Sequence, residues 1–191
     1  MTVFDVVEKR KEWVENITPD QLGHLVFLDE SGVNIDMTRR YGRAHSSERC
    51  VDHAPLNTPQ TTTILSSIRF NGEKAFTTYQ GGTTGERFVA YLKDVLLPTL
   101  HPGDIVVMDN MRSHHVKAVG ELLEEKGIIP LYLPPYSPDL NPIEKMWSKV
   151  KAILRCWKIR TPEALSDAIR KALDLISVQD CQHWFAASSY C

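Results

Sequence analysis

The stretch D-I-V-V-M-D-N, Asp104 to Asn110, decides how the rest of the chain is arranged. Four apolar residues, 105 to 108, follow a Pro-Gly turn and run directly into Asp109. A short apolar run of this kind predicts a strand buried on both faces. Burying a lone carboxylate is unfavourable, so Asp109 should lie at the edge of the sheet, paired or holding a metal ion. The alternative is that Asp109 only caps the following turn.

The composition is that of one soluble globular domain: 191 residues, 42% hydrophobic and 24% charged. A formal net charge of −2 excludes an overall basic coat for nucleic acid but leaves room for local basic patches. The start of the chain does not resemble a signal peptide. No apolar run approaches the roughly 18 residues that span a membrane, so we expect no membrane association.

The four cysteines form no C-x-x-C pair, which favours free thiols in a reducing, cytosolic setting. Cys181 and His183 are close enough in sequence to suggest zinc. No second pair stands at ligand spacing, and we therefore predict no zinc site.

Strands precede alternating helices and strands along the chain. Asn71-Gly72 is a strong hairpin signal, and Thr83 with Glu86 predicts a capping box at the first helix after the hairpin. Strands are predicted at 25–28, 61–70, 75–79, 105–108 and 128–133, with Pro130 placing the last at an edge. This order predicts an α/β fold with a mixed five-stranded sheet flanked by helices.

We divide the chain into three parts. Residues 1–19 are expected to form a lead-in helix or linker, and residues 20–160 the α/β domain. Residues 161–191 are expected to form a C-terminal helical extension, beginning with Thr161 as N-cap and Pro162 at the first helical position.

Three acids are candidates for one site. The strand at 25–28 is expected to end at Asp29, as the central strand ends at Asp109, and a right-handed crossover would place the two side by side. Glu144 follows a rigid Pro-rich loop, in the first turn of a helix that begins after Asn141. The alternative for Glu144 is a capping box with Asn141.

Three carboxylates without a Cys or His cluster favour a hard cation, Mg²⁺ or Mn²⁺. Two such ions about 4 Å apart activate a water or hydroxyl and stabilise the leaving oxygen of a phosphodiester. The helix at 142–157 is the most basic part of the chain, which suits a polyanionic substrate; the alternative is a solvated helical face. The basic side chains predicted to contact DNA are Lys145, Lys149, Lys151 and Arg155.

These segments also resemble a known family. F-L-D-E-S-G at 27–32, M-D-N-M-R-S-H at 108–114 and L-P-P-Y-S-P-D-L-N-P-I-E at 133–144 are similar to the three acidic motifs of mariner-type transposases. The 34 residues from 110 to 143, between the second and third acids, match the bacterial insertion-sequence branch known as the six-thirty group. R-R-Y-G-R-A at 39–44 and R-T-P-E-A-L at 160–165 extend the resemblance over nearly the whole chain.

The resemblance implies a ribonuclease H-like fold and a D-D-E catalytic domain that cuts transposon ends and joins the freed 3′-hydroxyl to target DNA, usually at TA. Carried over by position, Asp29, Asp109 and Glu144 are the metal-binding catalytic triad. The motif positions Asn110, His114 and Asn141 would orient a ligand or substrate, although His114 and Asn141 would serve equally as helix caps. Glu30 points to the other side of its strand and is expected to be structural.

The resemblance further implies double-stranded DNA as partner, a homodimer as the active form, and action in the bacterial cytoplasm at the nucleoid. Helix-turn-helix modules normally precede this domain, but here the chain starts almost at the linker. We therefore expect a catalytic domain alone, the second frame of a split element with an upstream helix-turn-helix polypeptide, or a decayed copy. The segment A-H-S-S-E-R at 44–49 departs from the family pattern. Alternative functions are a nuclease without strand transfer and a non-catalytic DNA-binding or dimerisation module.

Overall fold

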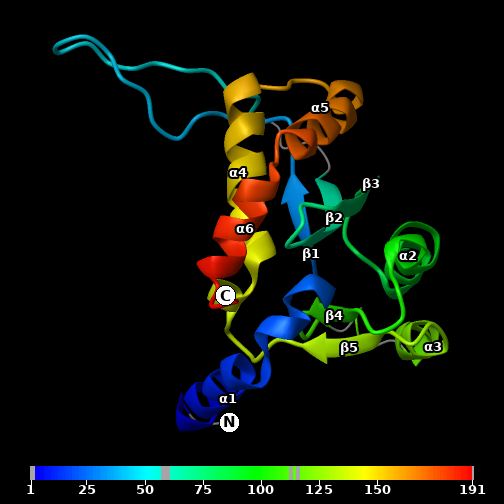
Figure 1. Ribbon diagram of the computed structural model, residues 1–191. Coiled ribbons are helices and arrows are strands. Elements are labelled where there is room, and N and C mark those ends of the chain that lie inside the picture. The colour runs from blue at the N-terminus through cyan, green and yellow to red at the C-terminus, as the bar shows by residue number, and fades with distance from the viewer. Residues whose placement is uncertain (1–2, 57–60, 112–113, 115–116, 191) are drawn as a thin grey trace.

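The computed structural model describes residues 3–56, 61–111, 114 and 117–190. Its centre is a five-stranded sheet in the order β3-β2-β1-β4-β5 (Figure 1). The strands are β1 (Leu25–Val33), β2 (Thr62–Arg69), β3 (Lys74–Gln80), β4 (Ile105–Met108) and β5 (Ile129–Tyr132). β2 pairs antiparallel with β1 and β3, whereas β4 pairs parallel with β1 and β5. The predicted mixed five-stranded sheet is confirmed.

Helices cover both faces of this sheet (Figure 1). One face carries α4 (Pro142–Trp157), α5 (Pro162–Asp174) and α6 (Val178–Ala186). The other carries α3 (Lys117–Glu125) and α2 (Gly85–Tyr91), which continues as a π-helical segment, Leu92–Leu96, and a 3₁₀ turn, Leu97–Thr99. The chain begins with α1 (Val3–Asn16), and short 3₁₀ helices span Pro19–His24 and Pro138–Leu140.

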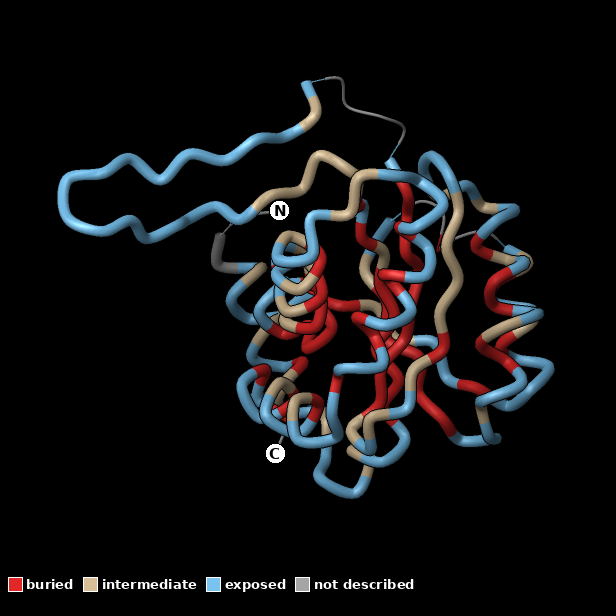
Figure 2. The backbone as a smooth tube through the Cα atoms, turned by 90° about the horizontal axis from the view of Figure 1, so that it is seen from above, coloured by how far each residue is buried: buried red, intermediate tan, exposed pale blue. Residues whose placement is uncertain are grey.

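The core has two layers because successive side chains of β1 point to opposite faces. Leu25 and Phe27 pack toward α4, α5 and α6, whereas Val26 and Leu28 pack toward α2 and α3. The four are buried, and Figure 2 shows the buried segments gathered between the helical layers. Trp13 of α1 belongs to the layer under α4, as do residues of α5 and α6.

The first strand is longer than predicted. Its parallel pairing with β4 covers Leu25 to Phe27, but its antiparallel pairing with β2 continues to Val33. The prediction that this strand ends at Asp29 was therefore wrong, because hydrogen bonds to β2 carry the E-S-G segment onward as strand. Asp29 lies two residues beyond the pair Phe27–Val107, and so does Asp109 on its own strand.

Local turn chemistry explains most of the remaining boundaries. Gly72 closes the predicted hairpin with a φ of 88°, which favours glycine. The helix after the hairpin is capped by Thr84, whose hydroxyl accepts from the Arg87 amide. The predicted capping box of Thr83 with Glu86 was therefore wrong, because the helix begins one residue later and Arg87, not a glutamate, lies at its third position. Pro130 lies in the edge strand β5, as predicted.

Residues 34–56 leave the sheet after β1 as a long exposed arm (Figures 1 and 2). Its base is fastened to the end of α4. Arg160 donates to the carbonyls of Ile35 and Met37, at 2.8 and 3.0 Å, and Lys158 pairs with Asp52 at 2.7 Å. The departure from the family pattern at 44–49 lies in this exposed arm.

Within the described part of the chain, no helix combines the length and apolar character needed to cross a membrane. Cys50, Cys156 and Cys181 are free thiols, as predicted. Cys191 lies outside the described residues.

Candidate active site

The three predicted acids line one pocket. It has a volume of about 450 Å³, and Asp29, Asp109 and Glu144 all contribute to its wall. The loop from Leu133 to Pro138 forms much of the opposite wall. The pocket thus lies where the parallel pairing of β1 and β4 ends and where α4 begins.

Asp29 is the most enclosed of the three acids. Its residue is 7% exposed, and the indole Nε1 of Trp147 donates to its Oδ2 at 3.0 Å. Burial raises the pKa of Asp29 to about 7, and the charges of Glu144 and Asp109 add to the effect. The Trp147 bond opposes this rise because it favours the ionised carboxylate.

The Asp109 carboxylate contacts a buried histidine, His114. Its Oδ1 accepts from the backbone amide of Met111 at 3.0 Å and lies 2.7 Å from Nδ1 of His114. Asp109 therefore does cap the turn that follows β4, as in the alternative prediction, and it also lines the pocket. His114 is fully buried, and its other ring nitrogen, Nε2, lies 3.2 Å from Oε2 of Glu30.

Glu144 is exposed in the first turn of α4. The capping-box alternative is not realised, because the side chain of Asn141 makes no hydrogen bond to the first turn. Asn141 is buried and lines the pocket, and its Oδ1 has no hydrogen-bond partner among the described residues. A buried amide oxygen without a partner is unfavourable, so this atom is suited to accept from a ligand or water in the pocket.

Asn110 joins the two loops beside the pocket. Its side-chain Nδ2 donates to the carbonyl of Leu133 at 2.7 Å, which ties the end of β4 to the segment after β5. Asn110 also lines the pocket.

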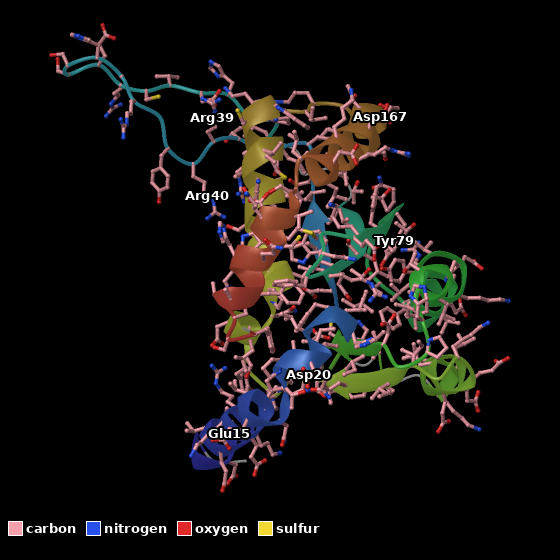
Figure 3. All side chains as sticks on the ribbon, viewed as in Figure 1. Glu15, Asp20, Arg39, Arg40, Tyr79 and Asp167 are labelled. Carbon is pink, nitrogen blue, oxygen red and sulfur yellow. The ribbon has the colours of Figure 1, made fainter. Side chains whose placement is uncertain are left out.

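The four basic residues of α4 fall on two sides of the helix. Lys145 donates to the Ser188 hydroxyl at 2.7 Å, and Lys149 pairs with Asp180 at 2.5 Å, so both are engaged toward α6. Lys151 and Arg155 follow Glu144 at seven and eleven residues and share its face. Burial and the nearby charge of Arg40 lower the pKa of Arg155. Figure 3 shows Arg40 beside α4 at the base of the arm.

The donor set fits a hard divalent cation, since the polar side chains that line the pocket include three carboxylates and two amides, those of Asn110 and Asn141. The charge of Glu144 helps to raise the pKa of Asp29, and a cation between the two would relieve that repulsion. In the part of the chain that the structure describes, no three His, Cys, Asp or Glu side chains already stand at metal-binding distance.

Two contacts at the site were not predicted from the sequence. Trp147 lies on the buried, apolar side of α4, yet its N–H donates to Asp29. A buried tryptophan near an expected acid is the available signal, because its N–H requires an acceptor. Glu30 does lie on the opposite face from Asp29, as expected, but there it contacts His114.

A mixed sheet of this order, flanked by helices on both faces, is the ribonuclease H-like fold. Residues 24–166 match the family described as DDE superfamily endonuclease. The chain belongs to this family, and the resemblance to D-D-E enzymes is confirmed. No curated protein matches the sequence.

Solved structures carry the same fold. The Mos1 transposase paired-end complex with left transposon end matches with a TM-score of 0.75 and 18% identity, over 99% of this chain and 60% of that chain. The Mos1 mariner paired end complex with Mn matches with a TM-score of 0.75 and 17% identity, over 99% and 61%. The isolated catalytic domain of Mos1 mariner transposase matches with a TM-score of 0.67 and 16% identity, over 99% and 90%. The present chain thus spans about three fifths of the longer Mos1 chains and nearly all of the catalytic domain.

Proposed function

We propose that this protein is the catalytic domain of a DNA transposase of the D-D-E type, from the bacterial insertion-sequence branch named above. The observation that carries the proposal is the meeting of Asp29, Asp109 and Glu144 at one pocket, in a chain of the DDE superfamily endonuclease family. Its substrates would be double-stranded transposon ends and target DNA, handled in the bacterial cytoplasm at the nucleoid.

We propose that the three acids together hold Mg²⁺, or Mn²⁺ in its place, as two ions. Structures of Mos1 transposase complexes with Mn and with Mg support the choice of metal. Bound there, the ions would supply Lewis-acid activation of a water or 3′-hydroxyl and stabilise the leaving oxygen of the phosphodiester. The exposed Glu144 side chain is free to turn toward the aspartates, and Trp147 holds the Asp29 carboxylate in place.

The remaining site residues would act around these acids. The unpartnered Oδ1 of Asn141 is placed to accept from a water or the substrate, and Asn110 holds the loop wall through Leu133. His114 orients Asp109. For DNA contact, Lys151 and Arg155 are favoured by their position beside Glu144; Lys145 and Lys149 would have to leave their partners near α6 to take part.

The partners proposed are a second copy of this chain and an upstream helix-turn-helix polypeptide that would supply sequence-specific binding. The Mos1 paired-end complexes support the arrangement of transposase on transposon-end DNA. The nucleotide sequence around the gene tests the upstream partner: inverted repeats and an overlapping frame encoding helix-turn-helix segments are expected.

The activity is tested on a duplex that carries those inverted repeats, with Mg²⁺ or Mn²⁺. We expect nicked ends and joined products from the wild type, and at least a thousandfold loss of both from Asp109→Ala, on the order of the effects seen when a catalytic group is removed. Asp167→Ala, which changes an exposed aspartate of α5, is the control and should keep full activity.

Three outcomes separate the alternatives. Full activity of Asp109→Ala rules out the assignment of the site. Cut ends without joined products identify a nuclease without strand transfer. DNA binding with no metal bound, unaffected by Asp29→Ala, identifies a non-catalytic module.

A further inference from the structure

Glu30 follows Asp29 in β1, and its side chain lies on the opposite face of the sheet. There it contacts His114, which in turn contacts Asp109 of the proposed metal site. Oε2 of Glu30 lies 3.2 Å from Nε2 of His114, and Nδ1 of the same ring lies 2.7 Å from Oδ1 of Asp109. The three side chains form a carboxylate–imidazole–carboxylate row. Its inner end is Asp109 at the wall of the pocket, and its outer end is Glu30.

The imidazole in this row has little freedom to move. His114 is fully buried, and the ring of Phe88 lies against it at 4.3 Å between centroids with an interplanar angle of 32°. The hydroxyl of Tyr132 donates to the His114 carbonyl at 3.2 Å, which fixes the backbone at the same point. Turning the ring over would place carbon atoms where the carboxylates now find nitrogens.

Both ring nitrogens face acceptors only: Nε2 faces the Glu30 carboxylate, and Nδ1 faces the Asp109 carboxylate and, at 3.2 Å, the Asp109 backbone carbonyl. An ionised carboxylate only accepts hydrogen bonds, so each ring nitrogen must donate, which describes an imidazolium. A neutral ring would have one donor and would leave one carboxylate without its bond.

The contact with His114 is the main polar interaction of the Glu30 side chain among the described residues. This side chain is 11% exposed, and its Oε1 has no hydrogen-bond partner among the described residues. A buried carboxylate is stable only when paired, and the charge of His114 is the pairing that the described structure provides. The contact is therefore what accounts for an acid at this position on an apolar face.

We propose that Glu30 is a positioning residue for the metal site: through His114, it fixes the orientation of the Asp109 carboxylate. This inference rests on the proposed function, because it assigns a task in holding the ion. Partners of this kind, one step behind a metal ligand, set the orientation of the ligand and change metal affinity about 10- to 100-fold when removed. The competing explanation is that the Glu30–His114 pair only stabilises the fold.

The test is the affinity of the protein for Mn²⁺ without DNA, followed by electron paramagnetic resonance of the free ion. Glu30→Gln keeps the shape and one acceptor oxygen but removes the charge. We expect its Mn²⁺ affinity to fall about tenfold while urea unfolding stays cooperative. Glu86→Gln, an exposed glutamate of α2, is the control and should bind as the wild type does.

A double-variant cycle shows whether Glu30 acts through the histidine. His114→Gln alone should weaken Mn²⁺ binding, and adding Glu30→Gln should weaken it little further, because the path is already broken. Mn²⁺ affinity of Glu30→Gln within twofold of the wild type overturns the inference. Full additivity of the two losses does so as well, because Glu30 would then act by another route.

Wild-type protein provides a readout that does not depend on the folding of a variant. In ¹⁵N spectra, both ring nitrogens of His114 should carry protons, and the Nδ1 signal should shift when Mg²⁺ is added. Signals that stay unchanged at saturating Mg²⁺ overturn the inference. If instead the wild type binds no Mn²⁺, or Asp109→Ala binds it normally, it is the proposed function that fails.

Discussion

Trp147 combines a core position with a polar contact at the site. Its ring is 3% exposed in the apolar stripe of α4, and its Nε1 reaches across to Asp29. A buried indole N–H needs an acceptor, and a buried carboxylate needs a donor, so the contact satisfies both. The same bond limits the rotation of the carboxylate that faces the pocket.

Replacing Trp147 by Phe keeps most of the apolar ring and removes the donor. We expect Mn²⁺ affinity to fall about tenfold, because a carboxylate that has lost its orienting partner holds a metal ion less well. Isothermal titration with Mn²⁺ measures the change. Trp184→Phe, in a partly buried tryptophan of α6, is the matched control. Equal affinity in Trp147→Phe and the wild type would contradict the role given to the indole.

At the scale of elements, α4 divides its tasks between faces. The apolar face, with Ile143, Met146 and Val150, is buried in the core. The side with Lys145 and Lys149 is bonded to residues of the C-terminal segment. Glu144, Lys151 and Arg155 share the remaining face, which borders the pocket, so a phosphate backbone lying along it would meet both cations and the acids.

This division of α4 predicts which of its basic residues control DNA affinity. The double change Lys151→Gln with Arg155→Gln should weaken binding of a non-specific duplex and lower the slope of log K against log salt by about 2, near one unit for each lost phosphate contact. Fluorescence anisotropy over a series of salt concentrations measures the slope. Lys117→Gln with Lys126→Gln, on the α3 side of the sheet, should leave it unchanged. A larger effect from Lys145→Gln with Lys149→Gln would show that DNA follows the α6 side.

At the scale of the molecule, α1 and the segment after α6 meet beside the loop that leads to Glu144. Nε1 of Trp13 donates to the Tyr190 hydroxyl at 2.8 Å, which in turn donates to the carbonyl of Leu140 at 2.6 Å. Arg10 of α1 pairs with Asp139 of the same loop, with one bond of 2.9 Å. The loop that leads to Glu144 is thus held by both terminal segments, which share the central core.

A buried ion pair joins the antiparallel and parallel parts of the sheet. Arg69 at the end of β2 donates to Asp104, just before β4, at 2.5 Å, and the His101 amide donates to the same carboxylate at 2.8 Å. Burial would raise the pKa of Asp104, but these donors outweigh it, and the pKa lies below its ordinary value. Its contribution to stability is therefore present above the unfolded pKa of about 3.9 and is lost as pH falls through the lower folded value.

Asp104→Asn should therefore lower the free energy of unfolding by about 3 kcal/mol at pH 7, since it removes the buried counter-charge of Arg69 and leaves only the exposed Glu73, 3.6 Å away. The difference from the wild type should narrow below about pH 4, as Asp104 itself becomes protonated. Urea unfolding at pH 7 and pH 3 measures both values. Asp94→Asn, at an exposed aspartate, is the control. An equal gap at the two pH values would show that the charge is not responsible.

Much of the fold could be predicted because its signals are local. The apolar runs at 105–108 and 25–28, the hairpin at Gly72 and the Thr161 cap each depend on a few neighbouring residues. The three acids could be predicted as neighbours for the same reason: two directly follow apolar runs that pair in parallel, and the third follows a rigid loop. The extent of β1 beyond Asp29 could not, because it depends on pairing with residues of β2 that lie 29 to 35 positions further along the chain.

Residue patterns along the chain are enough to predict the order of the elements, the acids that share the pocket, and the family. The partners of the acids in D-I-V-V-M-D-N depend instead on the folded arrangement. These partners are Arg69 for Asp104 and His114 for Asp109, with Glu30 behind the histidine. The Glu30–His114 contact joins residues 84 apart in the chain, and the Trp147–Asp29 bond joins residues 118 apart. Such contacts depend on sheet order and register, which arise from packing of the whole chain.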